Sequence, residues 1–203
     1  MAAVPTTTGR RERNKQLKLE RITAAARELF AEHGVDEVTT QQIAERADIG
    51  AGTLFLYARS KGELLLLVQN AAYADALERG TRAAAGTSDV LDGVLAIVRP
   101  VVECNRTHVE NGRTYLREMV FGDPEEPHHR EARAIVERTE QALAAVLSRG
   151  GHVPAEDAAT LAHVVSAVMF LAMATSADAG TRVDEIVAGI RRQVAALLPA
   201  RTS

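Results

Sequence analysis

Small residues at the start of one short predicted helix have the chemistry needed to approach a phosphate backbone. Gly50, Ala51 and Gly52 begin a helix predicted at roughly Ala51 to Tyr57, and none of the three has a bulky side chain. A helix N-terminus has free backbone N–H groups and the positive end of the helix dipole, and both attract phosphate. The chemistry that these residues predict is therefore phosphate binding.

Two further helices are expected to position this one. Thr39 and Gln42 form a capping-box pattern, in which hydroxyl and amide satisfy free N–H groups at the start of a short helix. The turn Asp48-Ile49-Gly50 follows it, and a longer helix ending at Gly34 precedes it. Such an arrangement is a helix-turn-helix, which places one helix in the major groove. The predicted inward residues are Leu19, Ile22, Ala26, Leu29 and Phe30 in the long helix and Ile43, Ala44 and Ala47 in the short one.

The run from Thr39 to Lys61 resembles the DNA-binding region of the tetracycline-repressor (TetR) family. Gly-Thr-Leu-aromatic-x-Tyr from Gly52, followed by Ser60-Lys61, stands in that family's register, and the resemblance covers about residues 15–67. It implies that Thr39 caps the first short helix and that the backbone at Gly52 comes close to phosphate. It further implies phosphate contacts from Thr40, Thr53, Tyr57 and Lys61, and contacts with base edges or the groove wall from Gln41, Ala51, Phe55 and Leu56.

The sequence departs from the family pattern at positions that would read bases. Ala51 and Leu56 stand where polar or aromatic residues are common, Ala58 replaces an aromatic residue, and Phe55 lacks a tyrosine hydroxyl. We therefore expect few direct hydrogen bonds to bases, apart from Gln41 with adenine, and contacts of the apolar side chains with thymine methyls. Taken singly, Thr39 and Ser60 are also explained as plain caps, and Phe55 and Tyr57 as core aromatics.

The charge distribution marks the N-terminus as the phosphate-facing end. Of the first 21 residues, six are basic and two acidic, a local charge of +4, whereas the whole chain carries −3. A solvated tail has the same composition. Residues 1–14 have no apolar period and are expected to form a flexible basic arm.

Abundant Ala and Leu, 3% aromatic residues and the absence of strand-like alternation predict an all-α fold. The expected domains are residues 15–60, a three-helix DNA-binding domain, and 61–203, a helical ligand-binding and dimerisation domain. A second capping-box pattern, Ser60 with Glu63, begins the first helix of the latter. Pro100 is expected to kink its helix. The helices of this domain are predicted near 61–84, 88–107, 109–121, 127–149, 155–178 and 182–198.

The family resemblance implies that the last two helices form a homodimer interface and that a small-molecule effector binds in the C-terminal domain. The small and apolar residues of these helices would equally serve an intramolecular core. An effector pocket is expected among helices 88–121 and 155–178, where each candidate is individually explained as core. The candidate lining residues are Val101, Cys104, His108, Tyr115, Met119, Met169 and Met173.

Several function classes find no support in the sequence. The single cysteine, Cys104, excludes an internal disulfide and is expected to be an inert thiol rather than a redox sensor. No metal site or cofactor is expected, because His128 and His129 stand in a predicted loop around Pro127. The chain has no signal-peptide pattern and no apolar run long enough to suggest a membrane span, and a cytoplasmic location is expected.

The sequence therefore favours a dimeric transcriptional regulator, most simply a repressor that leaves a palindromic operator when an effector binds. Two other classes stay open. A helical enzyme would need Glu-x-x-His sites on two helices, whereas the two such patterns here overlap around Pro127. A helical adaptor that has lost DNA binding would explain Ala51 and Leu56. In the regulator, effector binding would tilt the helix that begins after Ser60 and change the separation of the two recognition helices.

Overall fold

The structure is a computed structural model, and it describes residues 7–149, 153–176, 178 and 180–198. Within these residues the regular secondary structure is entirely helical, which confirms the predicted all-α fold. The helices are α1 (Thr7–His33), α2 (Thr40–Arg46), α3 (Ala51–Leu54), α4 (Lys61–Ala85), α5 (Val90–Arg106), α6 (Val109–Phe121), α7 (Pro127–Leu147), α8 (Ala155–Thr175) and α9 (Val183–Leu197).

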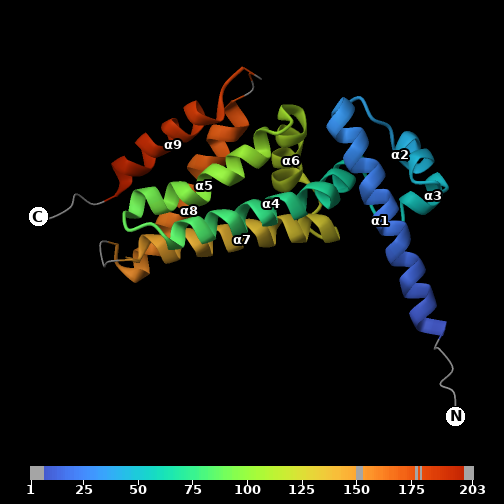
Figure 1. Cartoon of the computed structure of the whole chain (residues 1–203), viewed down its shortest axis with the longest axis horizontal. Coiled ribbons are helices and arrows are strands. Elements are labelled where there is room, and N and C mark those ends of the chain that lie inside the picture. The colour runs from blue at the N-terminus through green and yellow to red at the C-terminus, as the bar shows by residue number, and fades with distance from the viewer. Residues whose placement is uncertain (1–6, 150–152, 177, 179, 199–203) are drawn as a thin grey trace, which may run out of the picture.

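Helices α1 to α3 gather at one end of the molecule, and α4 leads from them into a larger helical body (Figure 1). In that body α4 packs against α5 and α7, α7 packs against α8, and α9 covers α5 and α8. The first half of α1 extends beyond the rest of the small domain (Figure 1). The helix-turn-helix is thus placed at one end of the molecule, with α4 as the covalent link.

One hydrophobic core runs through both parts. Ile22 and Phe30 of α1 and Ile43 of α2 belong to the same buried cluster as Leu64 and Leu65 in the first turns of α4. A fully buried Leu, Ile or Phe side chain stabilises the fold by about 1.5–3 kcal/mol relative to an exposed one. Because the core is continuous through α4, the small domain is held to the body by packing as well as by the chain.

Helix α1 starts earlier than the sequence predicted. The expected flexible arm covered residues 1–14, but residues 7–14 are helical, and residues 1–6 lie outside the described part. Residues 9–18 are exposed, so this extension is not stabilised by a core. Its Arg, Lys, Glu and Gln residues are good helix formers, which carry the helix past the last apolar anchor.

The first turn of α4 has half of its predicted capping box. Ser60 Oγ accepts a hydrogen bond from the Glu63 backbone N–H at 3.0 Å. The Glu63 side chain does not return to the cap, because it is buried against His129 of α7. The expected reciprocal bond is therefore wrong at this position, whereas the box of Thr39 and Gln42 is complete.

Helices α4 and α5 cross at a glycine. A Cβ on Gly80 would lie 2.8 Å from the Ile97 Cα and 3.0 Å from the Ala96 carbonyl oxygen. Pro100 has no N–H to donate to that carbonyl, the acceptor four residues before it, and the helix continues through the proline to Arg106. The α4 backbone thus approaches α5 one turn before Pro100.

Helix α8 is unusually apolar. Between Glu156 and Thr175 it is long and apolar enough to cross a membrane by length and composition. Within this chain, 33% of the apolar stretch is buried. Core helices that pack against other helices have the same composition, so this is weak evidence for a membrane span. The helix nevertheless leaves Leu171 and Val164 exposed.

The close crossing at Gly80 gives a stability test. Gly80→Ala is expected to lower the free energy of unfolding by about 1–3 kcal/mol, because backbone on both sides must move to admit the methyl group. Gly189→Ala in α9 is the matched control, since its Cβ would meet only the Arg192 guanidinium at 3.9 Å. Urea unfolding at one protein concentration measures both, and equal midpoints for the two variants would refute the close approach.

Candidate nucleic-acid interface and internal cavity

The first short helix is fixed at its N-terminus as predicted. Thr39 Oγ1 accepts from the Gln42 N–H at 3.2 Å, and Gln42 Oε1 accepts from the Thr39 N–H at 2.8 Å. Ile43 and Ala44 are buried, so the opposite face of α2 is exposed. On that face Gln41 donates its amide to Glu45 Oε1 at 2.8 Å. The amide predicted to read adenine is therefore accessible and held by a neighbour on its own helix.

The turn between α2 and α3 depends on an aspartate rather than a glycine. Asp48 has φ of 53°, while Gly50 has φ of −71° and serves as the N-cap of α3. Aspartate tolerates the left-handed region better than most residues do. Arg21 of α1 pairs with the Asp48 carboxylate at 3.3 Å. Both side chains are substantially exposed, so the pair itself contributes little to stability.

Helix α3 is shorter than predicted. Regular helix covers only Ala51 to Leu54, and the chain continues in turns to Tyr57, whose N–H donates to the Leu54 carbonyl at 2.9 Å. A Cβ on Gly50 or Gly52 would meet nothing within 4 Å. Packing within the chain therefore does not require glycine at either position, and the surface in front of them is open.

Two large apolar side chains follow on the same exposed edge. Phe55 is 47% exposed and Leu56 is 82% exposed. Ala51 and Thr53 are half-buried, and Leu54 is fully buried as core, as the sequence predicted. Large apolar groups on an otherwise polar surface often mark an interaction site. They stand where the resemblance expects contact with the groove.

Tyr57 and Lys61 tie this edge to the rest of the molecule. The Tyr57 hydroxyl donates to the Lys15 carbonyl in α1 at 3.3 Å, and Lys61 Nζ donates to the Asp36 carbonyl at 3.1 Å. The Tyr57 carbonyl is in hydrogen-bond contact with His128 Nε2 of α7 at 3.3 Å. Their predicted phosphate contacts, like that of half-buried Thr40, stay predictions.

The basic residues of α1 lie on its projecting first half. Arg10, Arg11, Arg13, Lys15 and Lys18 are all exposed. In Figure 1 this half of α1 extends past α2 and α3. The positive charge predicted for a flexible arm is thus carried by a helix beside the helix-turn-helix.

A buried amide joins the small domain to α6. Asn111, 3% exposed, donates its side-chain amide to the Phe30 carbonyl at 2.8 Å and accepts from the Val35 N–H at 2.7 Å. These groups flank the end of α1, where Gly34 has φ of +78°. Apart from a polar residue inside an apolar period, no sequence pattern indicated this contact.

A second buried contact joins α4 to α7. The His129 imidazole Nδ1 shares a hydrogen bond with Glu63 Oε1, and both side chains are almost completely buried. Glu118 of α6 approaches the other ring nitrogen at 3.7 Å. His128 and His129 were expected in a loop around Pro127, at the start of the helix predicted near 127–149, but α7 begins at Pro127 and both are helical. The partnership of Glu63 and His129, 66 residues apart, was not foreseen.

A cavity of about 280 Å³ that is partly open to solvent lies among α4, α5, α6, α7 and α8. Its walls include Val101, Tyr115, Met119, Met169 and Met173, five of the seven residues predicted for an effector pocket. Of the other two, His108 caps α6 by accepting from the Asn111 N–H, and Cys104 is half-buried and is not one of the lining residues. The additional lining residues are Tyr73, Leu116, Val120, Ile135, Val136, Thr139, Glu140, His163, Ser166, Ala167 and Phe170.

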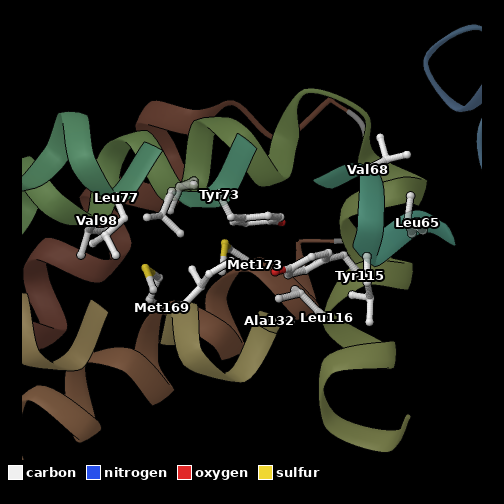
Figure 2. Close-up of a cluster of buried hydrophobic side chains, with 14 of the residues drawn as sticks. Leu65, Val68, Tyr73, Leu77, Val98, Tyr115, Leu116, Ala132, Met169 and Met173 are labelled. Carbon is white, nitrogen blue, oxygen red and sulfur yellow. The ribbon is translucent and has the colours of Figure 1, made fainter. Parts of the chain in front are cut away.

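Two stacked tyrosines form part of the cavity wall. The rings of Tyr73 and Tyr115 are 4.1 Å apart at their centroids and inclined by 20° (Figure 2). Asn105 donates to the Tyr73 hydroxyl at 2.9 Å, and the Tyr115 hydroxyl donates to Asn70 Oδ1 at 3.0 Å. Burial raises the pKa of both phenols well above the ordinary range, so both are uncharged at neutral pH.

Cys104 has the environment of an unreactive thiol. Burial raises its pKa to about 11, an effect that the Arg79 charge opposes. Because the thiolate is the reactive species, a protonated thiol at neutral pH is a poor redox sensor. Among the residues that the structure describes, no group of three or more His, Cys, Asp and Glu side chains could hold a metal ion.

Comparisons with known proteins agree with this geometry. Residues 22–68 match the family described as bacterial regulatory proteins, tetR family. The fold is similar to that of a TetR transcriptional regulator from Rhodococcus sp. RHA1, with a TM-score of 0.70 and 18% identity over 91% of this chain and 97% of that one. No curated protein sequence matches the chain.

A second similar structure is Thermus thermophilus FadR, a TetR-family transcriptional repressor in complex with lauroyl-CoA. Its TM-score is 0.70 and its identity 23%, over 91% of this chain and 97% of that one. FadR from Bacillus halodurans, a fatty acid degradation regulator, has a TM-score of 0.62 and 14% identity over 87% and 94% of the two chains.

The turn conformation of Asp48 can be tested by substitution. Asp48→Gly is expected to keep the turn, whereas Asp48→Val should be less stable than Asp48→Gly by about 1–2 kcal/mol because a β-branched residue resists positive φ. Both variants lose the pair with Arg21, so their difference reports the backbone. Thermal unfolding measures it, and a valine variant as stable as the glycine variant would disprove the left-handed turn.

The buried pair of Glu63 and His129 makes a separate prediction. His129→Ala should lower the free energy of unfolding by about 3–5 kcal/mol, because it leaves a carboxylate buried without its partner. Glu63→Ala should lower the free energy of unfolding less in the His129→Ala variant than in the wild-type protein, since the two residues interact directly. Urea unfolding of the four proteins measures the coupling, and strictly additive losses would contradict the contact.

Proposed function

We propose that the chain is a repressor of the tetR family that leaves a palindromic operator when a small molecule fills its cavity. The match of residues 22–68 to that family and the similarity of the fold to a TetR transcriptional regulator support this proposal. The observation that carries the proposal is the open edge of the helix-turn-helix from Gly50 to Leu56, which lies beside the basic half of α1. The helix-turn-helix supplies the shape for the major groove, and the basic residues supply charge for the phosphates.

We assign the contacts within this edge by exposure and chemistry. Gln41 is the candidate for hydrogen bonding to adenine, and Phe55 and Leu56 are candidates for thymine methyls. Thr40, Thr53, Tyr57 and Lys61 are the candidates for phosphate. Gly52, with open space in front of its Cα, allows the backbone and the half-buried Ala51 to approach the duplex.

We propose a homodimer through α8 and α9. Leu171 of α8 is 60% exposed, Val164 of α8 36% and Leu197 of α9 43%. A two-fold pairing of these helices with a second copy would cover such side chains and place two recognition elements on one duplex. The pairing would also explain why much of the surface of the strongly apolar α8 is not covered within one chain.

Release would follow from the elements shared by the cavity and the small domain. Helix α6 lines the cavity through Tyr115 and Met119, and its Asn111 is bonded to the end of α1. Helix α7 lines it through Ile135 and Val136, and its first turn contacts Tyr57 and Glu63. A ligand that moves α6 or α7 would tilt α4. The two recognition elements of the dimer would then no longer match half-sites that lie one helical turn, about 34–36 Å, apart.

The similar repressor structure with lauroyl-CoA supports a small-molecule effector in this fold. Asn111 of α6 contacts α1, and Glu63 of α4 contacts α7. A movement of α6 or α7 would therefore strain their contacts with α1 and α4. By linkage, DNA binding would in turn weaken ligand binding by the same factor.

The proposal is tested by selecting bound sequences from a random duplex library at two salt concentrations. Enrichment of a palindrome with A·T pairs in each half-site is expected, with affinity that falls steeply as salt rises. Salt-sensitive binding without an enriched sequence would contradict the repressor and favour an adaptor that has lost operator recognition.

A matched pair of variants tests the assigned edge. Leu56→Asp should weaken operator binding at least tenfold and leave the melting temperature unchanged, because the side chain is exposed and the new carboxylate would repel phosphate. Phe121→Asp in α6 is the control, since Phe121 is also 82% exposed and lies outside the helix-turn-helix. Equal affinities for the two variants in a fluorescence anisotropy titration would remove Leu56 from the interface.

A further inference from the structure

The cavity is apolar inside and charged only at one place on its wall. Glu140 and His163 are its charged or titratable lining residues, apart from the two neutral tyrosines, and no Lys or Arg is among the described residues that line it. His163 Nδ1 lies 2.9 Å from Glu140 Oε1. The imidazole is 74% exposed and the carboxylate 26%, so this pair marks the opening of the cavity to solvent.

Three hydroxyl groups of the interior are hydrogen-bonded within the chain. The Tyr115 hydroxyl donates to Asn70, the Tyr73 hydroxyl accepts from Asn105, and Thr139 Oγ1 donates to the Ile135 carbonyl at 2.8 Å. A carboxylate or phosphate placed among them would lose its hydration and gain no cation, which costs several kcal/mol. The interior therefore selects against a buried negative charge.

The volume of the cavity limits the size of its occupant. A dry apolar cavity of about 150 Å³ holds one benzene molecule, which has six non-hydrogen atoms. In proportion, about 280 Å³ holds about eleven such atoms. Met169 and Met173 on α8 border the space, and methionine side chains adapt to flexible ligands of irregular shape.

We propose that the effector is an uncharged amphiphile with an aliphatic part of about ten carbon atoms. The aliphatic part lies between α5, α6, α7 and α8, and a hydroxyl or similar neutral polar group lies at Glu140 and His163. There the hydroxyl donates to the carboxylate or accepts from the imidazole. This assignment rests on the proposed function, because it names the class of molecule that would release the operator.

Isothermal titration calorimetry on the full-length protein tests the ligand class with 1-decanol as the probe. Decanoate, which has the same chain length and a negative end, is expected to bind at least tenfold more weakly. Affinity should rise from 1-hexanol to 1-decanol and gain little at 1-tetradecanol. Decanoate binding as tightly as 1-decanol, or an absence of 1-decanol binding, would overturn the proposal.

Two variants test the location. Val136→Trp fills the cavity from α7 and should weaken 1-decanol binding at least tenfold, whereas Ala134→Trp, on an exposed position of α7 outside the lining, should not. Glu140→Lys replaces the negative charge at the opening by a positive one and should raise the affinity for decanoate at least tenfold. Wild-type affinities in both Val136→Trp and Glu140→Lys would place the ligand elsewhere.

The failure of this assignment is distinguishable from that of the repressor. If a palindrome is selected but 1-decanol neither binds nor releases it, the ligand class is wrong and the regulator stands. If 1-decanol binds as predicted but no operator is enriched, the cavity assignment stands and the repressor function is wrong.

Discussion

The first turn of α4 joins the small domain to the helical body and to α7. Ser60 caps it, Lys61 reaches back to the Asp36 carbonyl, and Glu63 is buried against His129 of α7. The leucines that follow belong to the core shared by the small domain and the helical body. Because a buried carboxylate is costly without its partner, α4 and α7 are held together at the point where the chain leaves the helix-turn-helix.

The same junction connects the cavity to the helix-turn-helix through α6 and α7. Helices α6 and α7 contribute walls to the cavity, and near their N-terminal ends Asn111 and His128 contact the small domain. His129 contacts Glu63 in the first turn of α4. Packed interfaces of this kind move between discrete arrangements rather than deforming continuously. In our account, a ligand would change DNA affinity by favouring an arrangement of α4 that spaces two recognition elements wrongly.

Local patterns predicted much of the fold, because helix period, caps and breakers act over a few residues. The bounds of α4 and α6, the box at Thr39 and the core role of Leu54 follow from such patterns. The pairing of Glu63 with His129 does not, since the two residues lie 66 positions apart in the chain. The positive φ at Asp48 was not predicted either, because the turn was expected to depend on Gly50. Five of the seven candidate effector residues line the cavity, whereas His108 caps α6 and Cys104 is not in the lining.

The distance between the two small domains of the proposed dimer tests whether a ligand releases DNA by moving α4. Spin labels at Glu37→Cys, an exposed position between α1 and α2, in a Cys104→Ser background allow double electron–electron resonance across the two-fold axis. We expect a narrow distribution of the distance between the two spin labels with the selected operator, and a different mean distance when 1-decanol occupies the cavity. Identical distributions in the two states would contradict a repressor released by movement of α4.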